Sequence, residues 1–202
     1  MKNNIISIGD KMKILKTDNN SPDEEVINEA VNVLADGGIV LYPTDTVYGL
    51  GADIFNNKSV RRIFKIKQRS LLKPLSILVS DTGSVDLVSK VSNSQKDIIN
   101  QYLPGPYTFI LKKSKIVPRV VTSGLTHVGV RVPDNEIACK LASLFPITTT
   151  SANLSDEEVL SNPEDILKQL GCDVDLVIDV GSIDSKPSKI IDLTTPKPTF
   201  IR

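Results

Sequence analysis

Short apolar runs alternate with segments of helical periodicity along almost the whole chain, and this alternation constrains the fold more than any other feature. The apolar runs predict strands at residues 39–42, 75–79, 109–111, 128–132, 147–149, 176–179 and 190–193. Helices are predicted between several of these runs, over residues 22–34, 59–67, 135–145 and 163–170. Because strands and helices intermix without a linker, we expect a single α/β domain with one large, twisted, mixed parallel and antiparallel sheet flanked by helices.

Turn residues mark where the helices begin and end. Ser21 is predicted to cap the first helix, with Pro22 at its first position and Glu24 completing a capping box. Asp134 is predicted to cap a helix that extends to Phe145. The apolar residues expected on the buried face of that helix are Ile137, Ala138, Leu141 and Leu144.

Charge, hydropathy and cysteine content exclude several functional classes. The 202 residues carry 24 Lys plus Arg and 24 Asp plus Glu, and this zero net charge argues against a general binder of polyanions. No apolar run reaches about 18 residues, so no membrane span is expected, and no secretory signal is recognisable. The two cysteines then favour a reducing cytoplasm. A single histidine, His127, excludes a metal site built on a histidine pair, and a structural role is expected for it.

A basic segment stands out between Lys58 and Lys73, where seven basic residues occur without an acid. Three of them, Lys67, Arg69 and Lys73, bracket a predicted helix end and the following loop, and could clamp an oligophosphate. The other four have the spacing of a solvated helix face: Lys58, Arg61, Arg62 and Lys65. The residue pattern alone leaves phosphate binding and a simple solvated surface both open.

Two polar stretches directly follow predicted strands, where loops of α/β proteins often carry sites. Residues 42–51 place hydroxyl groups and Asp45 between a proline and two glycines. Residues 148–155 carry hydroxyl or amide groups on most of their side chains. Ordinary turns with side-chain-to-backbone hydrogen bonds explain both patterns as well. Neither a P-loop nor a G-x-G-x-x-G motif occurs, so an ATP site here would lack both glycine-rich signatures.

Several short sequence motifs occur in a characteristic order along the chain. They are residues 42–51 (YPTDTVYGLG), Lys67-Gln68-Arg69, Lys73-Pro74-Leu75, residues 103–106 (LPGP), residues 128–133 (VGVRVP), Thr150-Ser151-Ala152-Asn153 and Pro187-Ser188 before Ile190-Ile191-Asp192. Their joint occurrence resembles the YrdC-like family of threonylcarbamoyl-AMP synthases, from about Asp23 to Arg202. No single block is decisive, whereas the ordered set is highly specific.

This resemblance implies a YrdC-like fold and a cytoplasmic nucleotidyltransferase. Such an enzyme joins L-threonine, bicarbonate and ATP, with Mg²⁺, into L-threonylcarbamoyladenylate and pyrophosphate for the t6A modification at position 37 of tRNA. Implied partners are downstream t6A-transferase proteins and tRNA or double-stranded RNA. The K-x-R motif implies Lys67 and Arg69 as catalytic residues, and no side-chain metal ligand is expected. Implied ATP contacts are Lys67, Arg69, Lys73, Ser151, Asn153 and Arg202; implied threonine contacts are Thr46, Arg131, Thr150 and Ser188.

The expected division is an N-terminal extension or first strand at residues 1–20 and a YrdC-like catalytic domain at residues 21–202. Three features depart from the family pattern. Leu78 stands where many members carry histidine, an acidic run at residues 156–158 replaces a glycine-containing turn, and Lys189 replaces a threonine. Two alternatives stay open: a binding module for double-stranded RNA or tRNA, and a catalytically altered paralogue of the same fold.

Overall fold

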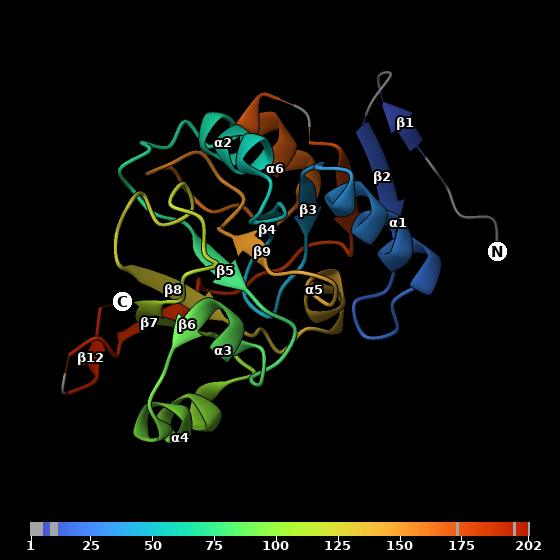
Figure 1. Ribbon diagram of the computed structural model, residues 1–202. Coiled ribbons are helices and arrows are strands. Elements are labelled where there is room, and N and C mark those ends of the chain that lie inside the picture. Colours follow the sequence, from blue (N-terminus) through green and yellow to red (C-terminus); the bar gives the residue numbers. More distant parts are fainter. Residues whose placement is uncertain (1–5, 9–11, 173, 196, 202) are drawn as a thin grey trace.

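Two β-sheets form the centre of the computed structural model, which describes residues 6–8, 12–172, 174–195 and 197–201 (Figure 1). The prediction of one large sheet is therefore wrong in that detail. The two sheets meet where β4 (Gly49–Gly51) approaches β9 (Ile147–Thr149). Scattered backbone hydrogen bonds join them there, such as Leu50 N to Thr150 O at 2.9 Å, in place of a continuous ladder. The result is a single α/β domain with two connected mixed sheets.

The first sheet has the strand order β1-β2-β10-β3-β4. In that order the strands span Ile6–Ile8, Met12–Lys16, Leu176–Asp179, Val40–Tyr42 and Gly49–Gly51. The central strand β10 is parallel to both of its neighbours, whereas β1 and β4 are antiparallel to theirs. Residues 12–16 are therefore part of this sheet as strand β2.

The second sheet has the order β12-β11-β7-β8-β5-β9, with β6 beside β7. These strands span Thr199–Phe200, Lys189–Asp192, Tyr107–Lys113, His127–Arg131, Ser76–Leu78, Ile147–Thr149 and, for β6, Ser89–Lys90. The register places Ser76 beside Gly129 on one side and beside Thr149 on the other. Polar residues of neighbouring strands are thus brought together in the middle of the sheet.

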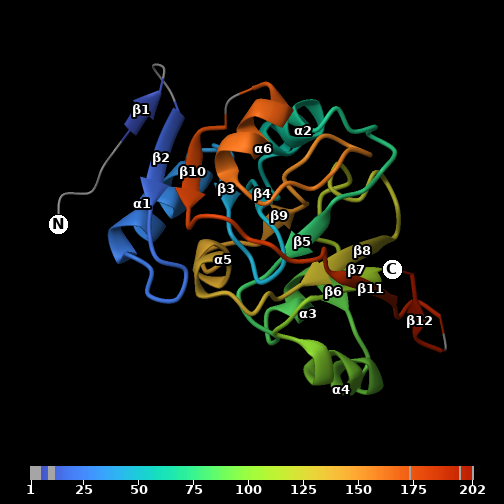
Figure 2. The ribbon, with the colours of Figure 1, turned by 180° about the vertical axis from the view of Figure 1, so that it is seen from behind.

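Helices pack around the two sheets. They are α1 (Glu24–Ala35), α2 (Asn57–Ile66), α3 (Val85–Val88), α4 (Asn93–Tyr102), α5 (Glu136–Leu141) and α6 (Pro163–Leu170). Helix α1 contacts β3, β10 and α5. Helices α2 and α6 lie side by side in both views of the molecule (Figures 1 and 2). Because α2 ends at Ile66, its C-terminal end leads directly into the K-x-R motif.

Two of the predicted helix caps are wrong by one or two residues. Asp23, not Ser21, caps α1 by accepting a hydrogen bond from Glu25 N at 2.9 Å. Asn135, not Asp134, caps α5 by accepting one from Ala138 N at 3.0 Å. In each case neighbouring residues have equally suitable side chains, and only the three-dimensional path of the chain selects between them.

The predicted end of α5 is also wrong, because the helix stops at Leu141. Pro146 disfavours helical backbone at the residue before it, which shortens the segment available to the helix. Leu144 consequently lies on the surface, 69% exposed, instead of in the core. By contrast, α6 is confirmed, with Asn162 as its cap and Gly171 in the left-handed conformation at its end.

The core contains one large charged side chain among its apolar ones. Lys67 is only 2% exposed, and it ranks with Tyr42, Tyr48 and Phe109 among the bulkiest fully buried side chains. A buried ammonium group is costly unless it is hydrogen-bonded, so its surroundings merit a functional explanation. In the part of the chain that the structure describes, no helix has the length and apolar character needed to cross a bilayer.

Candidate active site

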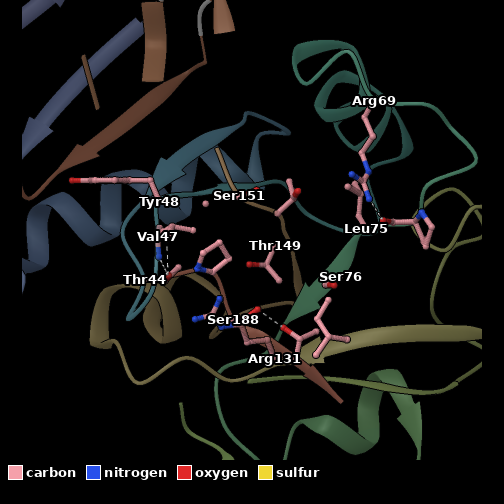
Figure 3. Close-up of a pocket in the computed structure, with 16 residues that line it drawn as sticks. Thr44, Val47, Tyr48, Arg69, Leu75, Ser76, Arg131, Thr149, Ser151 and Ser188 are labelled. Atoms are coloured by element: carbon pink, nitrogen blue, oxygen red, sulfur yellow. Dashed lines mark hydrogen bonds between the residues drawn. The ribbon is translucent and has the colours of Figure 1, made fainter. Parts of the chain in front are cut away.

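A cavity of about 190 Å³ opens where the two sheets meet (Figure 3). The loop between β3 and β4 forms one wall, and the segment after β9 forms another. The lining residues are Thr44, Val47, Tyr48, Gly49, Arg69, Pro74, Leu75, Ser76, Thr108, Arg131, Thr149, Thr150, Ser151, Pro187, Ser188 and Ile190. The volume is below the roughly 300–1,000 Å³ of pockets for drug-sized ligands. It therefore suits an amino-acid-sized ligand, and a nucleotide would extend beyond it.

The lining combines hydroxyl groups with two cations. Seven lining residues are serine or threonine, Arg69 and Arg131 supply positive charge, and no carboxylate side chain is among the described lining residues. In Figure 3 Arg69 descends from one side of the cavity and Arg131 lies on another, with Thr149 between them. Such a surface suits anions and polar neutral groups, because it offers guanidinium and hydroxyl donors and no carboxylate side chain among its described lining residues.

Arg131 sits at the end of β8 and is held by the loop between β3 and β4. Its side chain is 6% exposed and forms an ion pair with Asp45, which is 10% exposed. The same nitrogen, Nη2, also donates to Thr46 Oγ1 at 2.7 Å. The guanidinium is thereby fixed from behind, while the residue remains part of the cavity lining.

The hydroxyl of Thr46 is fully used inside the protein. Thr44 Oγ1 donates to Val47 O at 2.7 Å, so the 3.0 Å contact between the two threonine hydroxyls requires Thr46 to donate to Thr44. Thr46 then accepts from Arg131. Thr46 is 1% exposed and lies outside the cavity lining. The structure thus places Thr46 behind Arg131, although the motif had implied a threonine contact.

Lys67 supports the turn formed by Ser151-Ala152-Asn153, called the S-x-N turn below, from inside the protein. Its Nζ donates to Asn153 O at 2.6 Å, to Asn153 Oδ1 at 3.2 Å and to Ser151 O. Burial, assisted by the nearby charge of Arg69, lowers the pKa of Lys67 to about 7. Lys67 lies outside the cavity lining, so its immediate contacts are with the loop that carries Ser151.

The S-x-N turn is further tightened by its own side chains. Ser151 Oγ donates to Asn153 Oδ1 at 2.6 Å. The amide nitrogen of Asn153 donates to Leu154 O at 2.7 Å and to Glu157 O at 2.8 Å. Asn153 is 6% exposed and faces the interior, whereas Ser151 lines the cavity. The motif therefore has one residue at the cavity and one that shapes the turn.

Arg69 reaches the cavity from the loop after α2. Its guanidinium donates to Lys73 O at 3.0 Å and to Pro74 O at 2.8 Å, which orders residues 69–74. Partial burial lowers the pKa of Arg69, and the nearby carboxylate of Asp156 opposes that shift. Lys73 lies apart from the lining, with its side chain half exposed, and pairs with Asp156 at 2.8 Å. The three predicted clamp residues thus have three different positions: core, cavity and surface.

The remaining predicted contacts divide between the cavity and the undescribed part of the chain. Thr150 and Ser188 line the cavity, and Ser188 Oγ lies 2.9 Å from Thr108 Oγ1. Arg202 lies outside the described residues, so its predicted nucleotide contact stays a prediction. His127 is exposed and lies outside the described cavity lining.

Sequence reasoning missed two hydroxyl residues of the strands as site candidates, Ser76 and Thr108, and included Thr149 only within the polar stretch at residues 148–155. Ser76 begins β5, Thr108 lies in β7, and Thr149 follows Thr148 at the end of β9; all three line the cavity. Thr149 accepts a hydrogen bond from Tyr42 at 3.0 Å, which leaves its own proton for another acceptor. Gly129 creates the room, because a Cβ there would lie 2.4 Å from Ser76 Oγ. Strand register, which the sequence does not reveal, was needed to bring them together.

Comparison with known proteins decides the family. A protein-family model for Sua5, YciO and YrdC, described as telomere recombination, matches residues 32–202. The chain belongs to the Sua5/YciO/YrdC family. A relative from Methanocaldococcus jannaschii, named provisionally as a threonylcarbamoyl-AMP synthase, is 39% identical over 198 residues. That match covers 96% of this chain and 94% of the relative.

Solved structures of the family share this fold. Pyrococcus abyssi Sua5, crystallised with L-threonine, matches with a TM-score of 0.87 at 34% identity. The match covers 94% of this chain but only 56% of the Sua5 chain. Escherichia coli YciO matches with a TM-score of 0.85 at 35% identity, over 95% of this chain and 94% of that one. YciO is described as uncharacterized, so the relatives include both named synthases and a protein without an assigned activity. The family resemblance and the single α/β domain predicted from the sequence are confirmed.

Proposed function

We propose that this chain is a threonylcarbamoyl-AMP synthase, which converts L-threonine, bicarbonate and ATP into L-threonylcarbamoyladenylate and pyrophosphate. The observation that carries the proposal is the single cavity that joins Arg131, Arg69 and Ser151 with other hydroxyl groups and contains no acid among its described lining residues. The relatives named as synthases and the threonine-bound Sua5 structure support it. We propose further that residues 21–202 form the catalytic domain.

The amino-acid end of the cavity suits threonine. Arg131 offers a guanidinium for the threonine carboxylate, and Thr150 and Ser188, which line the same cavity, are proposed to contact the polar groups of the substrate. Thr46 contributes indirectly in this proposal, because its hydroxyl holds Arg131. The small volume limits the ligand at this end to about the size of an amino acid.

The chemistry requires two successive bond-forming steps. The threonine nitrogen attacks the carbon of bicarbonate, which loses water and gives an N-carboxylated threonine. One oxygen of that carboxylate then attacks the α-phosphorus of ATP, the bond to the β-phosphate oxygen breaks, and pyrophosphate leaves. Charge builds on the phosphate oxygens, and Arg69, which lines the cavity, is proposed to stabilise it. This mechanism needs cations and positioning more than a side-chain nucleophile, in keeping with the composition of the cavity.

In the proposed nucleotide site, direct and indirect roles are separated. Arg69 and Ser151 line the cavity and are proposed to contact ATP, together with Lys73 at the surface. Lys67 and Asn153 are proposed to hold the turn that presents Ser151. Lys67 could contact phosphate only by exchanging its present hydrogen bonds for new ones. Arg202 is proposed as a further nucleotide contact from its motif position alone.

Mg²⁺ is proposed to enter as part of the substrate, bound to the phosphates of ATP. Magnesium in nucleotide sites is held mainly by phosphate oxygens and water, with few protein ligands. Among the described residues no group of three or more His, Cys, Asp or Glu side chains could hold a metal ion. The ion would neutralise phosphate charge beside Arg69.

The proposed product would serve the t6A modification of tRNA in the cytoplasm. Because the adenylate is labile, downstream t6A-transferase proteins are the proposed recipients. Contact with tRNA is proposed through the exposed basic residues of α2, which include Lys58, Arg61 and Lys65. Binding of that kind should weaken steeply as salt is raised.

A second candidate function is that of a catalytically altered paralogue. It is favoured by the similarity to YciO, which covers nearly the full length of both chains, and by the acidic run at residues 156–158. The two candidates are separated by incubating the purified protein with Mg·ATP and bicarbonate, with and without L-threonine, and measuring pyrophosphate. Threonine-dependent release is expected of a synthase. Release that does not depend on threonine, or none at all, would exclude the first proposal.

A further inference from the structure

Asp45 lies directly behind the cation that faces the cavity. It is in the loop between β3 and β4, its side chain is 10% exposed, and it forms an ion pair with Arg131. Asp45 itself is not part of the described cavity lining. A carboxylate in this position can reach a ligand only through the guanidinium that it holds.

The contacts of Arg131 are divided unequally over its nitrogen atoms. Nη2 donates to both Asp45 and Thr46, whereas Nε is buried without a partner. The second carboxylate oxygen of Asp45, Oδ2, is also buried without a partner. A bidentate ion pair, with Nε and Nη2 facing the two carboxylate oxygens, would satisfy both atoms. Because both lack partners, Arg131 and Asp45 are joined by a single hydrogen bond. Within the described residues Nη1 has no hydrogen-bond partner in the protein, and Arg131 contributes to the cavity wall.

Because the Arg131–Asp45 ion pair is buried, removing either charge is costly. A buried guanidinium needs a compensating negative charge, and Asp45 is the acid that pairs with it. Thr46, the other partner, is neutral, and its hydroxyl proton is committed to Thr44. Without the charge of Asp45, the guanidinium would lose the only ionic partner that it has among the described residues and gain freedom to turn away from the cavity.

We propose that Asp45 is a positioning residue that aims Arg131 at the carboxylate of the amino-acid substrate and thereby sets the affinity for that carboxylate. The inference rests on the proposed function for the identity of the substrate. It assigns the aspartate of the residue 42–51 block a role in substrate recognition that is exerted entirely through Arg131. The role is distinct from a merely structural one, because it concerns one functional group of the ligand.

The test compares two ligands and two matched variants. Binding of L-threonine and of L-threoninamide, which lacks the carboxylate, is measured by titration calorimetry for wild type, Asp45→Asn and Asp175→Asn. Asp175 is the control because it also pairs with an arginine, Arg62, outside the lining of the cavity. Asp45→Asn is expected to weaken threonine binding about 10-fold or more and to change threoninamide binding less than twofold. Asp175→Asn is expected to leave both affinities unchanged.

A thermodynamic cycle identifies the path of the effect. If Asp45 acts through Arg131, the double variant Asp45→Asn/Arg131→Ala should bind threonine as Arg131→Ala alone does. Should Asp45→Asn not fold, Asp45→Glu takes its place, because it keeps the charge but displaces it by one methylene. The same selective loss for the carboxylate ligand is expected of it.

The outcomes separate the inference from the proposed function. Equal loss for both ligands, or an unchanged threonine affinity in a folded variant, overturns the positioning role while the synthase proposal stands. Additive effects of the Asp45 and Arg131 substitutions overturn it as well. A wild-type protein that binds no threonine contradicts the proposed function and, with it, the substrate on which the inference rests.

Discussion

Replacing Lys67 with methionine separates two opposing effects on the stability of the protein. Methionine fills similar space without a charge, so it removes the cost of burying an ammonium group. It also removes the donor to Ser151 O, Asn153 O and Asn153 Oδ1. Asn153 Oδ1 keeps the Ser151 hydroxyl as a donor, and Ser151 O keeps the backbone N–H of Asn153. Asn153 O has no other donor among the described residues, and a buried acceptor left unpaired costs about 1–3 kcal/mol. The balance between these effects depends on pH, because the wild-type amine can lose its proton.

The direction of the pH dependence follows from the lowered pKa of Lys67, which is about 7 in the folded protein against an ordinary value of 10.5. Between these values the unfolded chain binds more protons than the folded one, so the free energy of unfolding rises with pH. Below pH 7 both states carry the proton, and the burial penalty is present in full. At about 1.36 kcal/mol per unit, the rise between pH 7 and 10.5 is at most about 5 kcal/mol.

The assay is urea unfolding of wild type and Lys67→Met at several pH values from 6 to 10. The difference in free energy of unfolding between the two proteins should shift in favour of wild type as pH rises, by a few kcal/mol. Lys65→Met is the matched control, because Lys65 is exposed on the same helix. Its difference from wild type should not vary with pH. Parallel pH profiles for wild type and Lys67→Met would show that burial does not lower the pKa of Lys67.

Three further predictions concern the cavity and its rim. Gly129→Ala should lower the free energy of unfolding by about 1–3 kcal/mol in urea titrations, because the added Cβ overlaps Ser76 Oγ. It should also displace Ser76, which lines the cavity, and weaken threonine binding in calorimetry; an unchanged threonine affinity would contradict the role given to Gly129 in making room for Ser76. Arg69→Gln should cost about 3–4 kcal/mol of transition-state stabilisation, seen as a fall in kcat/KM for pyrophosphate release, and an unchanged value would show that Arg69 is misassigned. Asp156→Asn should leave the midpoint of urea unfolding nearly unchanged, since its pair with Lys73 is exposed, but should tighten Mg·ATP binding at low salt. The same Mg·ATP affinity for wild type and Asp156→Asn at low salt would argue against a role for the acidic run.

Local signals in the sequence predicted much of the fold. The apolar runs located the central strands, and the cap at Asn162 with Gly171 bounded α6 correctly. Short elements such as α3 and β6 were not predicted, because two to four residues carry too little periodicity. The division into two sheets depends on how β4 meets β9, which is a long-range contact without a local signal.

The sequence predicted which residues belong to the candidate site better than it predicted where they lie. The motifs selected Arg69, Arg131 and Ser151, which the structure places around one cavity. They could not indicate that Lys67 points inward to the S-x-N turn, because a lysine next to a helix end is normally solvated. They also could not show that Asp45 stands behind Arg131, since the two residues are far apart in the sequence and meet only through packing of a loop against β8.

The most direct test of the central claim is detection of the proposed product itself. The purified protein is incubated with Mg·ATP, L-threonine and ¹³C-bicarbonate, and the mixture is analysed at once by mass spectrometry. If the protein is a threonylcarbamoyl-AMP synthase, an adenylate of threonylcarbamate forms, and its mass increases by one unit with the labelled bicarbonate. The same product is expected to be absent when Arg131→Ala replaces wild type. An adenylate that never acquires the label, or no adenylate from a protein that binds both substrates, would contradict the proposed synthase activity.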